Sequence, residues 1–393
     1  MQGLLALRIH TDTGLIGHGE TYYVPEAVAA MIHDWMAKRL LGADPLAIES
    51  HWRFLYERTT NFGARGCELR AISAIDLALW DIFGQVSNQP IWQLLGGKSQ
   101  ERVRAYNSSA GPNYTAKGEG ASDGHPGWPG HGSIGNEGRL NDYWSVVNNP
   151  VEYAKELIDE GYKALKMWNF DFAAHKPNGP LYISKEDIEI GLKPMLAIRD
   201  ALGDKIEIIL DGHGFFQMPA ALRIAKAMRE IDPLWMEDVM RPDCIDSLAD
   251  FRNKAGVPLA VSEMMISTED YRLVLEKQAA DYIMIDPTWV GGISQTQRIT
   301  QMAQAYNVPV AMHDCTGPLT LLSGVHVATA NTNVAWQETV RAQIRLLYPE
   351  LIAETVKVEG GYAYAPEIPG MGASWLPELF EGSGNQCRTT KLN

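Results

Sequence analysis

Apolar residues in the second half of the chain recur in short runs that end on acidic or imidazole side chains. In the stretch 206–214, IEIILDGHG, four of the five residues before Asp211 are isoleucine or leucine, and His213 follows two residues later. Side chains alternate between faces along a strand, so Asp211 and His213 would face the same way if the strand extended that far. Taken alone, the pattern equally fits a helix-capping aspartate and a loop histidine.

The same pattern recurs downstream of Asp211. Short apolar segments lead into Glu237, Glu263, Asp286, His313 and Glu338. The successive steps are 26, 26, 23, 27 and 25 residues (211 to 237, 237 to 263, 263 to 286, 286 to 313 and 313 to 338). Each step has the length of one strand, one helix and two loops. The spacing therefore predicts a repeating βα architecture.

The first hundred residues follow a different pattern. Residues 1–25 indicate strand, turn and strand, and helical periodicity follows at 25–41, 45–57 and 68–85. We therefore expect an α+β domain at 1–100. The turn-rich tail, 355–393, is expected to pack back on this domain and complete it.

Eight strands alternate with helices between residues 102 and 338, within a second domain that we place at 101–354. Ser184, with Asp187 three residues on, has the pattern of a capping box and predicts a helix start. Eight parallel strands with right-handed crossovers favour a sheet closed as a barrel. A doubly wound open sheet is the alternative, but no GxGxxG phosphate loop follows the first strand.

One long irregular insert interrupts this pattern. Residues 111–138 contain nine glycines and no apolar period, and they also carry Tyr114, His125, Trp128 and His131. Such an insert is either a functional lid or disordered. The aromatic and imidazole side chains favour the lid.

Composition limits the classes of partner. The chain has 393 residues, 46% of them hydrophobic, and a net charge of −14, which argues against nucleic acid and anionic membrane surfaces as partners. It has no apolar run long enough to span a membrane, no signal peptide and only four scattered cysteines, so we expect a cytoplasmic location. A small anionic substrate remains compatible, because a bound divalent cation can dominate the local field.

The candidate metal-binding and catalytic residues lie at the strand ends. The carboxyl ends of barrel strands converge on one pocket, so these side chains are expected to lie close together. Strands three, four and five deliver Asp211, Glu237 and Glu263. Three converging carboxylates repel one another unless a cation lies between them. Ligands that are all oxygen favour Mg²⁺, or Mn²⁺, over Zn²⁺. The alternative is three unrelated helix-capping acids, which the equal 26-residue steps disfavour.

Strands six and seven end at Asp286 and His313. Neighbouring strands lie about 5 Å apart, so a hydrogen-bonded pair is expected. The carboxylate would fix the tautomer of the imidazole and raise its basicity, which suits a general base. Four histidines we interpret as structural: His326, which lies in a predicted helix, and His10, His33 and His51 in the first domain.

As a set, these residues resemble the enolase superfamily and, within it, the mandelate racemase-like subgroup of acid-sugar dehydratases. The resemblance covers nearly the whole chain and rests on the three acids, DPTWVGG with Asp286, HDCTGP with His313, and Glu338. It implies a modified (β/α)7β barrel with an α+β capping domain, and Mg²⁺-assisted removal of the proton α to a carboxylate. It also implies a homo-oligomer.

The resemblance implies individual roles as well. His313, held by Asp286, would be the base, while Lys166 and Glu338 would bond the carboxylate or enediolate oxygens. The Asp211-x-His213 pattern is similar to galactonate dehydratase-like members, in which the histidine protonates the leaving hydroxyl. Racemases of the family carry Lys-x-Lys on the second strand, whereas this chain has Lys166-Met167-Trp168 and lacks the second lysine.

The leading hypothesis is therefore a dehydratase that converts an aldonate, such as gluconate or galactonate, into a 2-keto-3-deoxy acid. One alternative is a racemase or epimerase of a hydroxy acid, with His213 and His313 as bases on opposite faces. Another is a non-catalytic barrel that binds a sugar acid. Members of the family usually have another strand before residues 4–11, which implies a truncated chain or a start codon placed too far downstream.

Overall fold

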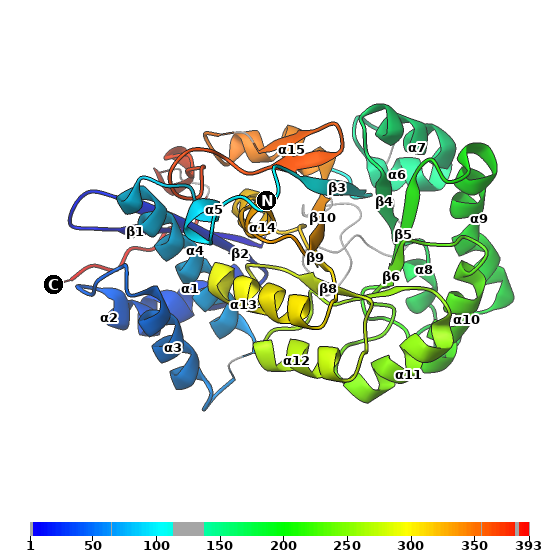
Figure 1. Cartoon of the computed structure of the whole chain (residues 1–393), viewed down its shortest axis with the longest axis horizontal. Helices are drawn as coiled ribbons and strands as arrows, with labels where there is room; N and C mark the ends of the chain where they lie inside the picture. The colour runs from blue at the N-terminus through cyan, green and yellow to red at the C-terminus, as the bar shows by residue number, and fades with distance from the viewer. Residues whose placement is uncertain (1–2, 64, 113–136, 355, 382–384, 393) are drawn as a thin grey trace.

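The structure is a computed structural model, and it describes residues 3–63, 65–112, 137–354, 356–381 and 385–392. Most of the insert 111–138, which we expect to be a lid, lies outside these residues. The chain forms a barrel that carries a smaller α+β lobe, built from the first hundred residues, on one side (Figure 1). No helix in the described part of the chain is long and apolar enough to cross a membrane.

Eight parallel strands form the barrel. They are β3 (Val103–Ser108), β4 (Ala164–Met167), β5 (Glu207–Asp211), β6 (Trp235–Glu237), β7 (Leu259–Val261), β8 (Tyr282–Ile285), β9 (Val310–Met312) and β10 (Val334–Thr339). They pair in sequence order, and β10 closes the sheet by pairing with β3, with Trp336 opposite Arg104. The predicted closed barrel is confirmed, and the doubly wound alternative is wrong.

The interior of the barrel is filled by one layer of side chains, with one residue from each strand. The layer consists of Tyr106, Ala164, Ile209, Trp235, Ala260, Met284, Ala311 and Trp336. Three large aromatic rings come from β3, β6 and β10, and the other five strands contribute smaller side chains, which lets the layer interdigitate. The barrel is therefore a packed core and has no open channel through it.

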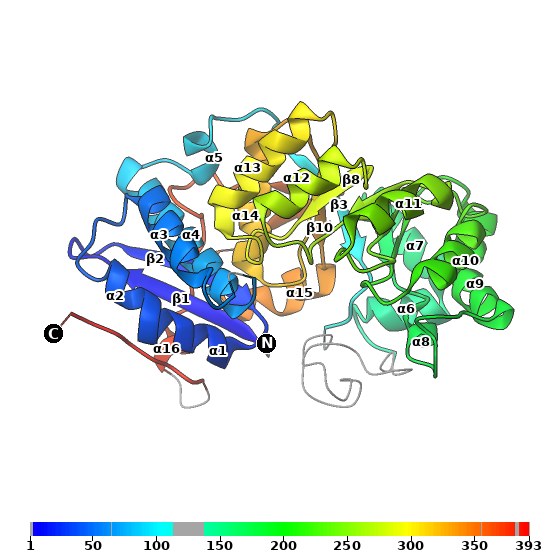
Figure 2. The same cartoon turned by 90° about the horizontal axis from the view of Figure 1, so that it is seen from below.

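Helices surround the barrel as an outer ring (Figure 2). They include α7 (Pro150–Asp159), α9 (Lys185–Leu202), α10 (Met218–Met228), α11 (Ile245–Ala255), α12 (Thr268–Glu276), α13 (Gly292–Ala305) and α14 (Pro318–Ala330). The capping box expected at Ser184 is present, since its hydroxyl accepts a hydrogen bond from the Asp187 amide at the start of α9. Shorter helices follow β3, β4 and β10: α6 (Asp142–Asn148), α8 (Asp171–Ala174) and α15 (Arg341–Leu346).

The N-terminal lobe packs helices against a hairpin. The hairpin pairs β1 (Leu4–His10) with β2 (Ile16–Tyr22), and its helices are α1 (Pro25–Ala30), a π-helical turn (Met31–Met36), α2 (Ala37–Leu40), α3 (Ile48–Thr59), α4 (Cys67–Ser87) and α5 (Ile91–Leu94). The segment expected as a helix at 25–41 is thus continuous through the π-helical turn. Gly19 of β2 lies so close to α4 that a Cβ there would overlap the Ala74 carbonyl oxygen.

Buried polar contacts fasten the lobe to the barrel. Glu20 of β2 accepts hydrogen bonds from the Thr320 amide (2.5 Å) and hydroxyl (2.6 Å) at the start of α14. Asp76 of α4 accepts from the Ser294 amide (3.0 Å) and hydroxyl (2.6 Å) on α13. Both carboxylates are buried and both bind a helix N-terminus, where unpaired amides favour negative charge. The lobe is thus held against the loops at the carboxyl ends of β8 and β9.

The C-terminal tail contacts both parts of the molecule. Its hairpin, β11 (Lys357–Glu359) and β12 (Tyr362–Tyr364), adds antiparallel to β3 of the barrel. Farther on, the Met371 amide donates to Asp81 (2.8 Å) and the Trp375 indole donates to the Gly19 carbonyl (3.0 Å) in the lobe. The expected packing against the N-terminal domain therefore describes only the later part of the tail. The domain boundaries themselves stay predictions.

Candidate active site

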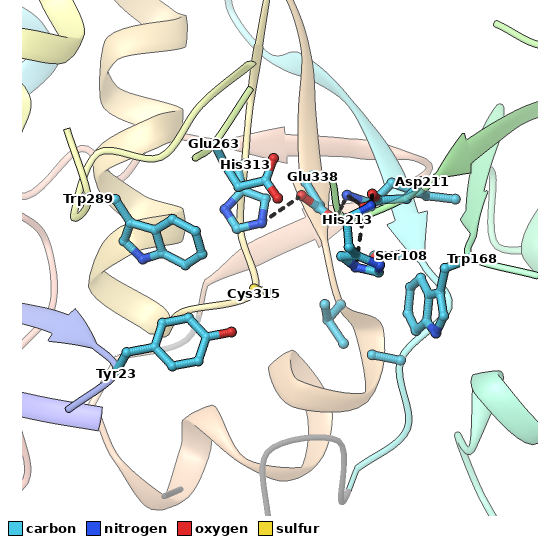
Figure 3. A pocket seen from close by; sticks show the side chains of 13 residues that line it. Tyr23, Ser108, Trp168, Asp211, His213, Glu263, Trp289, His313, Cys315 and Glu338 are labelled. Carbon is cyan, nitrogen blue, oxygen red and sulfur yellow. Dashed lines mark hydrogen bonds and ion pairs between the residues drawn. The ribbon is translucent and has the colours of Figure 1, made fainter. Parts of the chain in front are cut away.

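A pocket lies at the carboxyl ends of the barrel strands, against the N-terminal lobe (Figure 3). Six of the eight predicted site residues line it: Lys166, Asp211, His213, Glu263, His313 and Glu338. The other two, Glu237 and Asp286, are buried. Tyr23, from the loop after β2, and Trp289, from the loop after β8, close the side opposite His213 and Trp168 (Figure 3).

The predicted pair of His313 and Asp286 is present. The imidazole Nδ1 lies 2.7 Å from Oδ2 of Asp286, and the same carboxylate accepts hydrogen bonds from the Thr288 amide and hydroxyl, both at 2.7 Å. These donors fix the carboxylate, so in the neutral imidazole Nδ1 carries the proton and Nε2 is the acceptor. Nε2 lies 3.8 Å from Glu338.

The surroundings of His313 make its imidazole strongly basic. Burial opposes the protonated form, but the neighbouring Cys315 and Glu338 and the hydrogen bond to Asp286 together hold the pKa of His313 well above the usual 6.5. In its neutral form, a pocket-lining imidazole with this partner can take a proton from a bound molecule.

His213 lies on the other side of the pocket, but not at the end of a strand as expected. Strand β5 stops at Asp211, and His213 has a positive φ of 47°. The strand does not extend as far as His213, because the backbone turns into the left-handed region right after the glycine. The turn nevertheless directs the imidazole into the pocket, and its amide donates to Oδ1 of Asp211 at 2.9 Å.

A second histidine–aspartate pair forms there. Nδ1 of His213 lies 2.7 Å from Oδ2 of Asp171, and its Nε2 lies 3.6 Å from Oδ2 of Asp211. Burial opposes the charged imidazole, but these two carboxylates raise the pKa of His213 to about 9. At neutral pH the imidazole is therefore protonated and can donate a proton.

Asp171 is a site residue that the sequence reasoning missed. It begins the short helix α8, five residues after Lys166, and it contacts His213 from 42 residues away in the chain. Burial raises its pKa to about 6, against the lowering effect of His213. The segment WNFDF at 168–172 has no strand-end pattern, and only the proximity of an acid to Lys166 could have drawn attention to it.

Replacing Asp171 with Asn should weaken the donor function of His213. Asn cannot balance the charge of an imidazolium, so we expect turnover to fall by about 10–100-fold, part of the 10²–10⁴ that a positioned acid contributes. Steady-state kinetics of Asp171→Asn would measure the loss, with the exposed Asp159→Asn as the matched control. Unchanged turnover would show that Asp171 does not support the site.

Lys166 lies at the centre of the acidic groups. Its ammonium is 3.0 Å from Asp211, 2.5 Å from Glu237 and 2.7 Å from Glu338, and its side chain is 2% exposed. Burial opposes its charge, but the three carboxylates hold its pKa well above the usual 10.5. Lys166 is therefore a buried, permanently charged donor within the pocket wall.

The predicted metal ligands are near one another but do not form a closed metal site. In the described ranges, no group of three or more His, Cys, Asp or Glu side chains is arranged to hold a metal ion. The physical reason is that the Lys166 ammonium pairs with Asp211 and Glu237, while Glu263 shares a hydrogen bond with Asp238.

The donor chemistry nevertheless fits a hard cation. Burial raises the pKa of Glu237 to about 8 and that of Glu263 well above its usual range, with the other acids adding to both shifts. Oε2 of Glu263 is buried and has no hydrogen-bond partner among the residues that the structure describes. Three carboxylates from adjacent strands, one with an unsatisfied oxygen, are a ligand set that Mg²⁺ accepts.

Comparison with known proteins places this geometry in context. Residues 150–379 match the enolase C-terminal domain-like family, and residues 1–96 match the N-terminal domain of mandelate racemase and muconate lactonizing enzymes. The chain is 27% identical to arabinonate dehydratase of Saccharolobus solfataricus over 380 residues, covering 96% of this chain and 90% of that protein. It is 28% identical to D-xylonate dehydratase of Haloferax volcanii, and the match covers 94% of this chain and 82% of that protein.

The fold has solved counterparts as well. An enolase protein from environmental sequencing of the Sargasso Sea superposes with a TM-score of 0.84 at 32% identity, covering 97% of this chain and 93% of that one. The likeness thus extends over both the lobe and the barrel.

Proposed function

Because the chain belongs to the enolase superfamily, among the mandelate racemase-like acid-sugar dehydratases, we propose that it removes water from an aldonate such as gluconate or galactonate to give a 2-keto-3-deoxy acid. It is an enzyme of the hydro-lyase type. The observation that carries the proposal is the presence of two histidine–aspartate pairs on opposite sides of one pocket.

The first half of the reaction is assigned to His313. Its Nε2, the acceptor nitrogen, takes the proton from C2 of the substrate, and the electron pair of that bond moves into the carboxylate to give an enediolate. Lys166 donates to the carboxylate oxygens on which the charge develops, and we assign the neighbouring Glu338 the same role in its protonated form, because an ionised carboxylate cannot donate a hydrogen bond. The buried ammonium of Lys166 needs no reorientation for this role, since three acidic partners already fix it.

The second half is assigned to His213. The enediolate electrons form the C2–C3 double bond as the C3–oxygen bond breaks, and the protonated imidazole gives its proton to the departing hydroxyl, which leaves as water. The resulting enol tautomerises to the 2-keto acid. Asp171, hydrogen-bonded to Nδ1 of His213, stabilises the imidazolium before the transfer.

We further propose that Mg²⁺ is the cofactor and that Asp211, Glu237 and Glu263 would hold it. When bound, the cation would lower the cost of the negative charge that develops on the substrate carboxylate. The unsatisfied oxygen of Glu263 supports this assignment.

The residue at position 168 supports dehydration over racemisation. Trp168 stands where racemases of the family carry their second lysine. A non-catalytic barrel would have no need of two paired histidines.

A screen of acid sugars tests the proposal. The protein is incubated with Mg²⁺ and a panel of mono- and diacid sugars, and 2-keto acid is measured as the product. We expect at least one acid sugar to give a 2-keto-3-deoxy acid. Recovery of an epimer without loss of water would show a racemase instead, and no reaction with any acid sugar would contradict the proposal.

A further inference from the structure

Three largely apolar side chains form one wall of an otherwise polar pocket. They are Val340, Ala110 and Trp168, from the segments that follow β10, β3 and β4, and we call them the apolar wall. Among the described residues that line the pocket, only Ala110 and Val340 have side chains without a polar atom. The proposed chemistry uses none of the three.

The order of the strands makes this wall continuous. Strand β3 pairs with β10 on one side and with β4 on the other. Each wall residue comes two positions after a pocket residue at or next to the end of its strand, and these strand-end residues are Glu338, Ser108 and Lys166. Val340, Ala110 and Trp168 pack together in one cluster with Ala342. The lining of the pocket therefore changes from polar to apolar one step beyond these strand ends.

The hydroxyl groups next to the wall are already bonded elsewhere. Ser109, which precedes Ala110, donates its hydroxyl to a carbonyl of β4 at 2.6 Å. Thr339, which precedes Val340, donates its hydroxyl to a carbonyl of β3 at 2.8 Å. A ligand hydroxyl that faced Ala110 and Val340 would therefore give up its hydrogen bonds to water and gain none from these two side chains.

Trp168 indicates which part of the substrate meets the wall. Its ring centroid is 5.8 Å from that of His213, and it lies beyond His213 as seen from His313 (Figure 3). The proposed reaction holds C2 of the substrate at His313 and C3 at His213. The carbon atoms after C3 therefore continue past His213, and the end of the chain lies against the apolar wall.

We propose that the apolar wall receives the methyl group of a sugar acid whose chain ends in CH₃, a 6-deoxyaldonate. The inference rests on the proposed function and narrows its substrate class. A terminal methyl group gains apolar contact with the wall. The hydroxymethyl group of gluconate or galactonate would instead be buried there without a hydrogen-bond partner from Ala110 or Val340.

Matched substrates test the proposal. Gluconate and galactonate, in both enantiomers, are each compared with the 6-deoxyaldonate of the same configuration, and kcat/KM is measured with the intact protein. We expect the preferred 6-deoxyaldonate to exceed its aldonate by about 10–100-fold, the usual effect of leaving a buried hydroxyl unpaired. Equal values, or a higher value for the aldonate, would overturn the proposal. So would a pentonate of the same configuration that exceeds the 6-deoxyaldonate, because the wall would then only limit chain length.

Two variants locate the effect by placing a hydroxyl in the wall. Val340→Thr keeps the shape of the side chain, and Ala110→Ser adds a single oxygen. Each should lower the ratio of 6-deoxyaldonate to aldonate by about 3–10-fold, because the substrate hydroxyl gains a partner. Val86→Thr, which changes an exposed valine of α4, is the matched control and should leave the ratio unchanged. Circular dichroism confirms that each variant is folded, and a ratio that survives in both wall variants would contradict the proposal.

A binding measurement separates this inference from the proposed function. A ligand that binds the folded protein raises its melting temperature, and this effect needs no turnover. We expect the preferred 6-deoxyaldonate to raise the melting temperature more than its aldonate does at the same concentration. If this difference appears but no acid sugar is dehydrated, the proposed function fails and the methyl subsite stands. If aldonates are dehydrated equally well and raise the melting temperature equally, the methyl subsite is wrong and the dehydratase proposal stands.

Discussion

A His313→Ala variant should form no 2-keto acid and should also fail to exchange the C2 proton in heavy water. Removal of the base should reduce turnover by at least 10²–10⁴-fold, because no other described group combines an acceptor nitrogen with access to the pocket on that side. Product assay and proton NMR of the substrate in heavy water measure the two losses separately. His10→Ala, which changes an exposed histidine of the lobe, is the matched control.

His213→Ala should affect the two steps of the reaction differently from His313→Ala. The base remains, so exchange at C2 can continue while product formation falls by roughly 10²–10⁴-fold. The decisive result is exchange at the wild-type rate in His313→Ala. That result would identify another base, and the roles assigned to the two histidines would have to be reversed.

Removal of divalent cations should abolish activity, and Mg²⁺ should restore it. Without a cation, four buried acids repel the negative charge that develops on the substrate carboxylate, and only one lysine stabilises it. The activation free energy of proton removal therefore rises by about several kcal/mol. Treatment with EDTA followed by dialysis and titration with Mg²⁺ measures the effect. Full activity of a preparation free of metal would overturn the ligand assignment.

A binding measurement makes the metal test independent of activity. A cation that binds only the folded protein raises its melting temperature, and at 100 times the dissociation constant the gain is about 2.7 kcal/mol. We expect Mg²⁺ to raise the melting temperature of the wild type and to have much less effect on Glu263→Gln. This variant keeps the size of the side chain and removes the charge of the carboxyl that has an unsatisfied oxygen.

The fold was predictable because its signals are local and repeated. Apolar runs that end on acids or a histidine every 23 to 27 residues correspond to β5 through β10, and the cap at Ser184 lies where the structure places the start of α9. The β11–β12 hairpin was not predicted, because strands of three residues are too short to show alternation.

The site was predictable only as far as strand ends determine it. Lys166, Asp211, Glu263 and Glu338 line one pocket because parallel strands bring their carboxyl ends together. The partner of His213 depends instead on how the loop after β4 folds back, and no periodicity in the sequence encodes that. The pairing of Lys166 with three acids could not be predicted either, because it depends on how separate strands bring these charges together in space.

The filled layer inside the barrel has a kinetic consequence. Tyr106, Trp235 and Trp336 block the barrel below Lys166, so a ligand has no route through the amino-terminal end of the strands. Substrate and product must use the same entrance, at the end that faces the lobe. A product molecule therefore has to leave before the next substrate can enter, and added 2-keto acid should act as a competitive inhibitor, raising KM without lowering kcat.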